Sequence, residues 1–255
     1  MADIVYPLYI VIDASLSMGK EIGGKKRIDL AKEIPLSLLK LYEEDPSLVS
    51  SVYVSVMTFN TEVKVFAELG EIPKLRNLAK QEIVAESRTH FGKVFSKLYD
   101  QIKSDYERLS GANKFMKPAV IIVTDGAPND DKDERHAAFR KLLPVDKQTG
   151  KLDKKANKLW PQIFMFGIDA ANENVLKAYS YKNTHYYKAS DSLDVDEQIQ
   201  EIARKVKDAV TTTFLDPTIQ TDALEPWKQF IEKGLDGSDD VETDPLAFDE
   251  YGNIY

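Results

Sequence analysis

The sequence predicts an α/β protein built on a doubly wound, mostly parallel sheet, with one antiparallel edge strand and helices on both faces. Strand-like and helix-like segments alternate along most of the chain, which is typical of this class. Several of the strands are continuous apolar runs, as expected where a sheet is covered on both faces. Two of these runs, residues 7–13 and 118–125, end in an aspartate.

The N-terminal part begins with a buried strand at residues 7–13, followed by a helix at residues 26–43. Apolar side chains of this helix recur on one stripe, at Ile28, Ala31, Ile34, Leu38 and Leu41. Pro35 lies inside the pattern, so we expect either a kink or a later helix start. Residues 52–59 form the second strand, and residues 61–69 are expected to return beside it as the antiparallel edge.

The C-terminal part of the domain repeats this alternation. A long amphipathic helix is expected at residues 91–109, with an apolar face made of Phe91, Val94, Phe95, Leu98, Ile102 and Tyr106. The later elements are a strand at 118–125, a helix at 131–142, a strand at 161–168, a short helix at 174–179, an outer strand at 184–189 and a helix at 194–213. Ligands of such sheets bind beyond the carboxyl ends of the strands, where Asp13 and Asp125 fall.

We divide the chain into an α/β domain at residues 1–213 and an acidic C-terminal extension at residues 214–255. No Lys or Arg follows Lys233, whereas acidic residues are frequent from Asp236 onward. This composition is typical of a solvated tail. Aromatic residues in the same stretch favour docking on this domain or on a partner, at Phe248, Tyr251 and Tyr255. Both interpretations remain open.

The composition limits the classes of partner. Hydrophobic residues make up 43% of the chain, enough for a large core, and 34 basic against 42 acidic residues give a net charge of −8. Nucleic acids and anionic membranes select basic surfaces, so we expect neither as a partner. The absence of cysteine excludes disulfides, thiolate zinc sites and a cysteine nucleophile. With no secretory leader and no apolar run of membrane-spanning length, we expect a cytoplasmic protein.

Oxygen-bearing side chains follow two strands and precede one helix. They are Asp13, Ser15, Ser17, Thr89 and Asp125. A small hard cation such as Mg²⁺ prefers six oxygen ligands, and this set supplies neutral hydroxyls together with two carboxylates that act directly or through water. Because hydroxyls leave the ion under-neutralised, it needs one more anionic oxygen, which an Asp or Glu of another protein would supply. We therefore expect a Mg²⁺ site, with Mn²⁺ or Ca²⁺ left open.

The Asp-x-Ser-x-Ser motif at residues 13–17 and the Asp-Gly pair at residues 125–126 resemble the metal-ion-dependent adhesion site of the von Willebrand factor A (VWA) family. The resemblance covers roughly residues 5–213. It implies a Rossmann-like VWA fold and a protein-interaction module that is not an enzyme. The middle threonine of the family matches Thr89 less closely, because many members place glycines where this chain has residues 87–88. We expect a stiffer or differently placed loop there.

Within the family, residues 9–18 (YIVIDASLSM) and 122–130 (IVTDGAPND) are most similar to the bacterial tellurium-resistance TerY-type proteins. This resemblance implies a cytoplasmic stress-response protein that acts as a scaffold, with a kinase and a phosphatase among its partners. The acidic extension at residues 214–255 is not covered by it.

Each motif also has a simpler structural interpretation. The residues at 13–17 favour turns and helix caps, and Thr89 would suit the N-cap of the helix at residue 91. Gly126 would suit a left-handed turn. The basic run at residues 25–27 is interpreted as a solvated helix start. For His90 a loop position is favoured over the rim of the site, and for Asp130 and Asp131 rim and helix N-terminus are equally compatible.

Three rival functions differ in class. Residues 19–26 nearly fit the phosphate-binding loop of a nucleotide hydrolase, but Lys26 stands where a Ser or Thr should hold Mg²⁺. An aspartyl-phosphate phosphatase with Asp13 as nucleophile would need a second Asp where Ser15 stands. The third alternative is a metal-independent scaffold that acts through its acidic extension.

Overall fold

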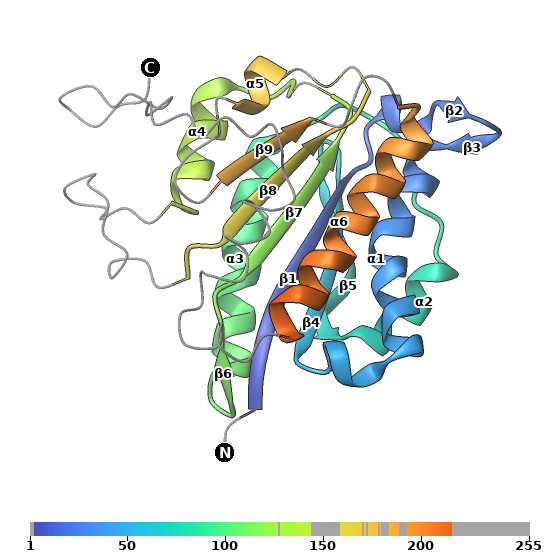
Figure 1. Ribbon diagram of the computed structural model, residues 1–255. Coiled ribbons are helices and arrows are strands. Elements are labelled where there is room, and N and C mark those ends of the chain that lie inside the picture. Colours follow the sequence, from blue (N-terminus) through green and yellow to red (C-terminus); the bar gives the residue numbers. More distant parts are fainter. Residues whose placement is uncertain are drawn as a thin grey trace.

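In the computed structural model, a seven-stranded sheet lies between two layers of helices (Figure 1). The structure describes residues 3–126, 128–143, 159–169, 171, 173–177, 179, 184–188 and 193–215. The extension predicted for residues 214–255 therefore lies outside the described residues, apart from its first two positions.

The sheet has the predicted class. The strands are β1 (Asp3–Asp13), β2 (Glu21–Ile22), β3 (Lys25–Lys26), β4 (Val52–Phe59), β5 (Val63–Glu71), β6 (Asn113–Phe115), β7 (Ala119–Thr124), β8 (Gln162–Gly167) and β9 (Thr184–Lys188). The main sheet has the order β5-β4-β1-β7-β8-β9, and β6 pairs with the start of β1. Among the described strands of this sheet, β5 alone is antiparallel to its neighbour. The mostly parallel sheet with one antiparallel edge strand is thus confirmed.

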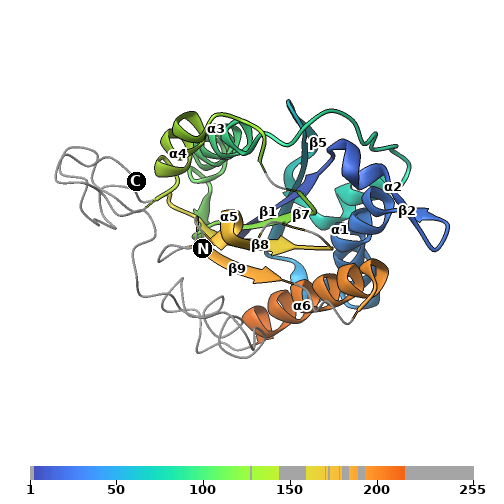
Figure 2. The same ribbon diagram turned by 90° about the horizontal axis from the view of Figure 1, so that it is seen from above.

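Helices cover both faces of the sheet, as predicted. They are α1 (Arg27–Glu44), α2 (Arg76–Ala79), α3 (Phe91–Leu109), α4 (Lys132–Arg140), α5 (Glu173–Lys177) and α6 (Val195–Leu215), with 3₁₀ turns η1 (Leu16–Gly19), η2 (Pro46–Val49) and η3 (Ile72–Leu75). Seen from above, α1 and α6 lie on one side and α3 and α4 on the other (Figure 2). No described helix has both the length and the apolar character that a bilayer crossing requires.

Strand β1 shows how one apolar run builds both layers of the core. Leu8, Ile10 and Ile12 pack in the core beneath α1 and α6. Tyr9 and Val11 pack in the core beneath α3 and α4. All five side chains are fully buried. Because each such side chain contributes about 1.5–3 kcal/mol on burial, a strand covered on both faces favours apolar residues at every position.

Helix α1 begins at Arg27 and continues through Pro35 to Glu44, so the later start is not observed. The predicted apolar stripe is buried at all five positions, Ile28, Ala31, Ile34, Leu38 and Leu41. The apolar face of α3 is also buried, with the exception of Tyr106, which is 38% exposed and packs edge-on against Phe115. Tyr106 lies near the C-terminal end of the helix, and Phe115 is the last residue of the short strand β6.

The segment between β1 and α1, for which no element was predicted, has regular structure. It forms the 3₁₀ turn η1 and then a hairpin of β2 and β3, which projects from the body of the molecule (Figure 1). The hairpin turns at Gly23 and Gly24, whose φ angles are 58° and 82°. Tight hairpin turns need two successive positive φ angles, which glycine adopts without strain. Strand β6 and helix α2 were likewise not predicted.

The strand order changes direction between β1 and β7. Helix α1 follows β1 on one face, whereas α4 follows β7 on the other face. The loops that leave these two neighbouring strands therefore run to opposite faces of the sheet, and ligands of open α/β sheets bind at such a point. Asp13 ends β1 and Asp125 directly follows β7 at this point.

Candidate metal centre

The first part of the candidate site is the turn after β1. Asp13 is the last residue of the strand and is fully buried. Its Oδ1 accepts a hydrogen bond of 2.8 Å from the backbone N–H of Ser15, and its Oδ2 accepts one of 2.5 Å from the hydroxyl of Thr124. The Oγ of Ser15 lies 3.1 Å from the Oγ of Ser17. The turn thus holds two hydroxyls beside a buried carboxylate.

Asp125 brings the second carboxylate into the same cluster. It directly follows β7, and its side chain is fully buried. Its Oδ1 accepts a hydrogen bond of 2.7 Å from the hydroxyl of Ser17, and its Oδ2 accepts one of 2.6 Å from Nη1 of Arg27. Through Ser17, the loops after β1 and β7 are therefore joined by a direct contact.

Thr89 reaches the cluster from the segment before α3. A Cβ placed on Gly126 would lie 3.2 Å from the hydroxyl oxygen of Thr89 and 3.8 Å from Oδ2 of Asp13, so both oxygens flank the same glycine. Asn129 holds the backbone of Thr89 through two hydrogen bonds. Its side-chain oxygen accepts from the Thr89 N–H at 3.2 Å, and its own N–H donates to the Thr89 carbonyl at 2.8 Å. All five predicted residues thus meet at one edge of the sheet.

Ser87 shows how the loop before Thr89 forms without the glycines that many family members have there. Its φ is 64°, in the left-handed region that glycine adopts freely and that costs a serine about 1–2 kcal/mol. The Ser87 carbonyl accepts a hydrogen bond of 3.0 Å from the N–H of Leu16. The loop before Thr89 therefore lies directly beside the Asp-x-Ser-x-Ser turn.

Arg27 corrects the interpretation of the basic run. Lys25 and Lys26 are exposed, as expected of a solvated helix start, but Arg27 is only 7% exposed. Its Nη1 contacts Asp125, and its Nη2 donates to Oδ2 of Asp169 at 2.5 Å. In the sequence, the position of Arg27 at the start of the helix after the motif was a weak signal for its contact with Asp125. Asp169 belongs to no motif, so no signal in the sequence indicated its contact with Arg27.

Burial raises the pKa of the Asp13 carboxyl to about 6, and the nearby charge of Asp125 acts in the same direction. The hydrogen bonds from Thr124 and Ser15 oppose this shift. Two buried carboxylates close together are unfavourable unless a cation compensates them. The local electrostatics therefore favour a positively charged ligand.

The oxygen atoms of the cluster fit a small divalent cation. In an octahedron with metal–oxygen distances of about 2.1 Å, neighbouring oxygens lie about 3 Å apart. The Ser15–Ser17 and Ser17–Asp125 oxygen pairs are 3.1 Å and 2.7 Å apart. Among the described residues, no group of three His, Cys, Asp or Glu side chains is placed to hold a metal ion together, so the donors would be two carboxylates and three hydroxyls. This chemistry suits a hard ion better than zinc.

Several neighbours have structural roles. Asp131 caps α4 by accepting hydrogen bonds from the N–H groups of Asp133 and Glu134. Asp130 accepts a hydrogen bond of 2.6 Å from the N–H of Gly92. Both therefore serve helix starts, as one of the two sequence interpretations expects, and the rim position stays a prediction. The N-cap position of α3 is taken by His90 and not by Thr89, and its side chain makes no capping hydrogen bond.

Residues 19–26 do not take the form of a phosphate loop. Such a loop follows a strand directly and opens a helix with its backbone N–H groups turned toward the phosphates. Here Glu21 pairs with Lys26 and Ile22 with Lys25 in the hairpin. Its two glycines lie at the tip of the hairpin and not at the start of a helix.

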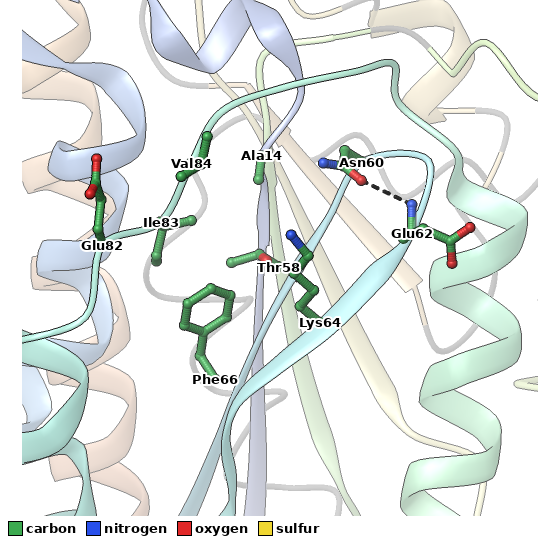
Figure 3. Close-up of a pocket in the computed structure, with 9 residues that line it drawn as sticks. All are labelled: Ala14, Thr58, Asn60, Glu62, Lys64, Phe66, Glu82, Ile83 and Val84. Carbon is green, nitrogen blue, oxygen red and sulfur yellow. Dashed lines mark hydrogen bonds between the residues drawn. The ribbon is translucent and has the colours of Figure 1, made fainter.

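The surface beside the cluster is partly apolar. Leu16, between the two serines of the motif, is 71% exposed, and Val84 is 56% exposed. A pocket adjoins Ala14, between Asp13 and Ser15 (Figure 3). The pocket is lined by Ala14, Thr58, Asn60, Glu62, Lys64, Phe66, Glu82, Ile83 and Val84.

Comparisons with known proteins agree on the fold. The profile of the von Willebrand factor type A domain matches residues 8–205, and no curated protein sequence matches. The pilus adhesin SpaC from Lactobacillus rhamnosus GG has a TM-score of 0.58 at 15% identity, over 83% of this chain and 31% of SpaC. A mutant of the PilB minor pilin from Streptococcus sanguinis has a TM-score of 0.55 at 12% identity, over 84% of this chain and 63% of the pilin. A von Willebrand factor type A protein from Catenulispora acidiphila has a TM-score of 0.50 at 12% identity, over 80% of this chain and 43% of that protein.

This chain spans less than two thirds of the length of each of these three proteins. At such low identity the likeness concerns the fold, and the functions of the whole proteins do not transfer with it.

Proposed function

The chain belongs to the von Willebrand factor type A family, whose domains commonly mediate protein–protein interactions, and we propose that it binds another protein through a divalent cation. The cation is Mg²⁺, with Mn²⁺ and Ca²⁺ as alternatives. Its ligands are Asp13, Ser15, Ser17, Thr89 and Asp125. The observation that carries the proposal is the continuous chain of oxygen contacts from Ser15 through Ser17 to Asp125, which joins the loops after β1 and β7.

The chain's own residues prepare the site in three ways. Asp13 orients the turn by accepting the Ser15 N–H, so that the serine hydroxyls lie together. Asn129 sets the position of Thr89 through its backbone. The hydroxyls are weak neutral ligands, so a bound ion keeps a strong affinity for one more anionic oxygen, which an Asp or Glu of the partner supplies. The exposed Leu16 offers that partner an apolar contact beside the ion.

The experiment is thermal unfolding of the wild type, Ser15→Ala and Ser55→Ala at increasing Mg²⁺ and Mn²⁺ concentrations. Ser55 is a matched control, because it is also buried but donates to the carbonyl of Ala67 on the β4–β5 edge. An ion that binds only the folded state stabilises it by about 2.7 kcal/mol at a hundredfold excess over Kd. We expect this gain in the wild type and Ser55→Ala and not in Ser15→Ala. A wild type without any gain would contradict the cation site.

A bacterial stress-response or tellurium-resistance-type role in the cytoplasm is a further part of the proposal. Its support is the resemblance of residues 9–18 and 122–130 to TerY-type proteins, which also points to a kinase and a phosphatase as partners. Co-purification of such partners with the wild type, lost with chelator and with Ser15→Ala, would support it. A complex that survives chelator would favour the acidic extension, outside the described residues, as the binding segment.

The proposal assigns no catalytic group to this chain. The nucleotide-hydrolase alternative would need a phosphate cradle at residues 19–26, and residues 21–26 form a hairpin instead. ATP turnover by the purified full chain, abolished by Lys25→Ala, would nevertheless require the enzyme alternative to be restored.

A further inference from the structure

A buried arginine adjoins the proposed cation site, and neither metal motif includes it. Arg27 opens α1 and is 7% exposed. Its guanidinium lies 2.6 Å from Oδ2 of Asp125 and 2.5 Å from Oδ2 of Asp169. It therefore bridges the loop after β7 and the loop after β8.

Three elements hold this bridge in position. The hairpin leads directly into α1, and the N–H of Arg27 donates to the carbonyl of Lys20 at 3.1 Å. Asp169 has a φ of 51°, a left-handed conformation that Asp and Asn tolerate better than most residues. Its N–H donates to the side-chain oxygen of Gln198 on α6 at 2.9 Å. The guanidinium is thus placed by the surrounding fold and not by the proposed metal ligands alone.

The bridge changes the charge balance of the site. Three carboxylates (Asp13, Asp125 and Asp169) and one guanidinium (Arg27) give a formal charge of −2, which a divalent cation would cancel. Without Arg27 the same carboxylates would carry −3. They would bind a cation more strongly but would leave a net negative charge that repels an incoming carboxylate.

The bridge also restricts how Asp125 can act as a ligand. Oδ2 of Asp125 is occupied by Arg27, so that Oδ1, which contacts Ser17, is the oxygen left for an ion. Ca²⁺ often takes both oxygens of one carboxylate, whereas Mg²⁺ takes one.

We propose that Arg27 is the resident counter-charge of this cation site: it lowers the affinity for the ion, disfavours Ca²⁺ relative to Mg²⁺ and leaves the loaded site neutral for a partner carboxylate. This inference rests on the proposed function, because it concerns the same ion. It assigns a specificity-determining role to the Arg27–Asp169 pair, at positions that the adhesion-site motifs do not contain.

The test is calorimetric titration of the metal-free full chain with Mn²⁺, Mg²⁺ and Ca²⁺. Arg27→Gln removes the charge, Arg27→Lys keeps it, and Asp169→Asn removes a carboxylate while retaining a side chain suited to the left-handed backbone. We expect Arg27→Gln to bind Mn²⁺ and Mg²⁺ about tenfold more tightly, the effect of one unit charge a few ångströms away in a partly hydrated site. Its gain should be larger for Ca²⁺. Arg27→Lys should stay within about threefold of the wild type, and Asp169→Asn should bind less tightly.

A counter-charge predicts opposite changes in ion affinity, tighter binding for Arg27→Gln and weaker binding for Asp169→Asn. A purely structural ion pair predicts weaker binding for both variants. If the pair merely holds the loops together, both variants loosen the site and both weaken ion binding, which would overturn the inference. A wild type that binds no divalent ion would overturn the proposed function and this inference together. A wild type that binds, with unchanged affinity in Arg27→Gln, would overturn this inference alone. Circular dichroism checks the fold; if Arg27→Gln does not fold, tighter binding by Asp169→Asn would overturn the inference.

Discussion

Two buried arginines, Arg27 and Arg135, bind carboxylates at the two ends of one loop, the segment that follows β7. Nη1 of Arg135 contacts Oδ1 of Asp130 at 2.7 Å and also the Asp130 carbonyl at 3.0 Å, while its Nε donates to the hydroxyl of Tyr179. The other oxygen of Asp130 accepts the N–H of Gly92. Both carboxylate oxygens are therefore used by groups that belong to the frame of the domain.

The pair at the other end is built differently. Asp125 also uses one oxygen for an arginine, Arg27. Its second oxygen accepts from the hydroxyl of Ser17, which adjoins the hydroxyl of Ser15, and among the described residues no frame group holds it as Gly92 holds Asp130. Hydroxyls can donate to a carboxylate or turn their lone pairs to a cation. An arginine–carboxylate pair is present at both ends of the loop. At Asp130 both carboxylate oxygens are fixed by the frame, whereas at Asp125 one oxygen contacts a hydroxyl that a cation could replace. The four predictions below test this difference, in order of decreasing effect.

The largest effect is expected for Asp130→Ala. It leaves Arg135, whose side chain is 10% exposed, without its carboxylate, and an unpaired buried charge costs about 3–5 kcal/mol. Urea unfolding with and without Mg²⁺ should show the same loss in both conditions. Asp131→Ala is the matched control: it removes only an exposed cap and should cost about 1 kcal/mol. If Asp130→Ala lowers the unfolding free energy by less than about 1 kcal/mol, or if Mg²⁺ restores the lost stability, the Arg135–Asp130 and Arg27–Asp125 pairs do not differ as described.

Arg27→Gln should lower the unfolding free energy of the metal-free protein by about 2 kcal/mol, because Asp125 loses its counter-charge in a buried setting. Unlike the loss at Asp130, this one should shrink when Mg²⁺ is added, since the ion replaces the missing positive charge. Urea unfolding at several Mg²⁺ concentrations measures it. Identical losses with and without ion would show that both arginines are structural.

The Arg135 end should also respond to pH. Burial lowers the pKa of His136, which packs edge-on against Tyr179; Lys132 and then Arg135 act in the same direction, and Asp133 opposes them. The unfolded chain takes up this proton near pH 6.5 and the folded chain only at lower pH, so stability falls as pH drops below about 6.5.

His136→Gln should remove this part of the pH dependence between pH 7.5 and 5. Unfolding free energies of the wild type and the variant across that range measure the difference. Parallel curves for the two proteins would contradict the prediction.

The smallest effect on stability is expected for Leu16→Ser, since Leu16 is 71% exposed beside the candidate site. The unfolding free energy should stay within about 0.5 kcal/mol of the wild type. Met18, two residues on, is fully buried, and Met18→Ala should cost about 2–5 kcal/mol. If Leu16→Ser instead destabilises the fold as much as Met18→Ala does, Leu16 cannot serve as a surface reserved for a partner.

Much of the fold was readable from local patterns. The apolar runs of β1 and β7 predicted buried parallel strands, because only a strand covered on both faces tolerates so few polar residues. The apolar stripe of α3 predicted a helix at about residues 91–109, and the structure has it at Phe91–Leu109. The five oxygen-bearing residues of the candidate site were named because each follows a strand or precedes a helix, and the topology brings those ends to one edge.

The sequence by itself therefore determined the class of the sheet, the faces of the helices and the cluster of Asp13, Ser15, Ser17, Thr89 and Asp125. Only the tertiary structure decided that Arg27 is buried, that it contacts both Asp125 and Asp169, the latter 142 residues further along the chain, and that residues 21–26 form a hairpin. The physical reason is the sequence distance over which each kind of interaction acts. Hydrophobic periodicity reports how one segment meets the core, whereas the partner of a charged side chain depends on which distant loops the completed sheet brings within a few ångströms.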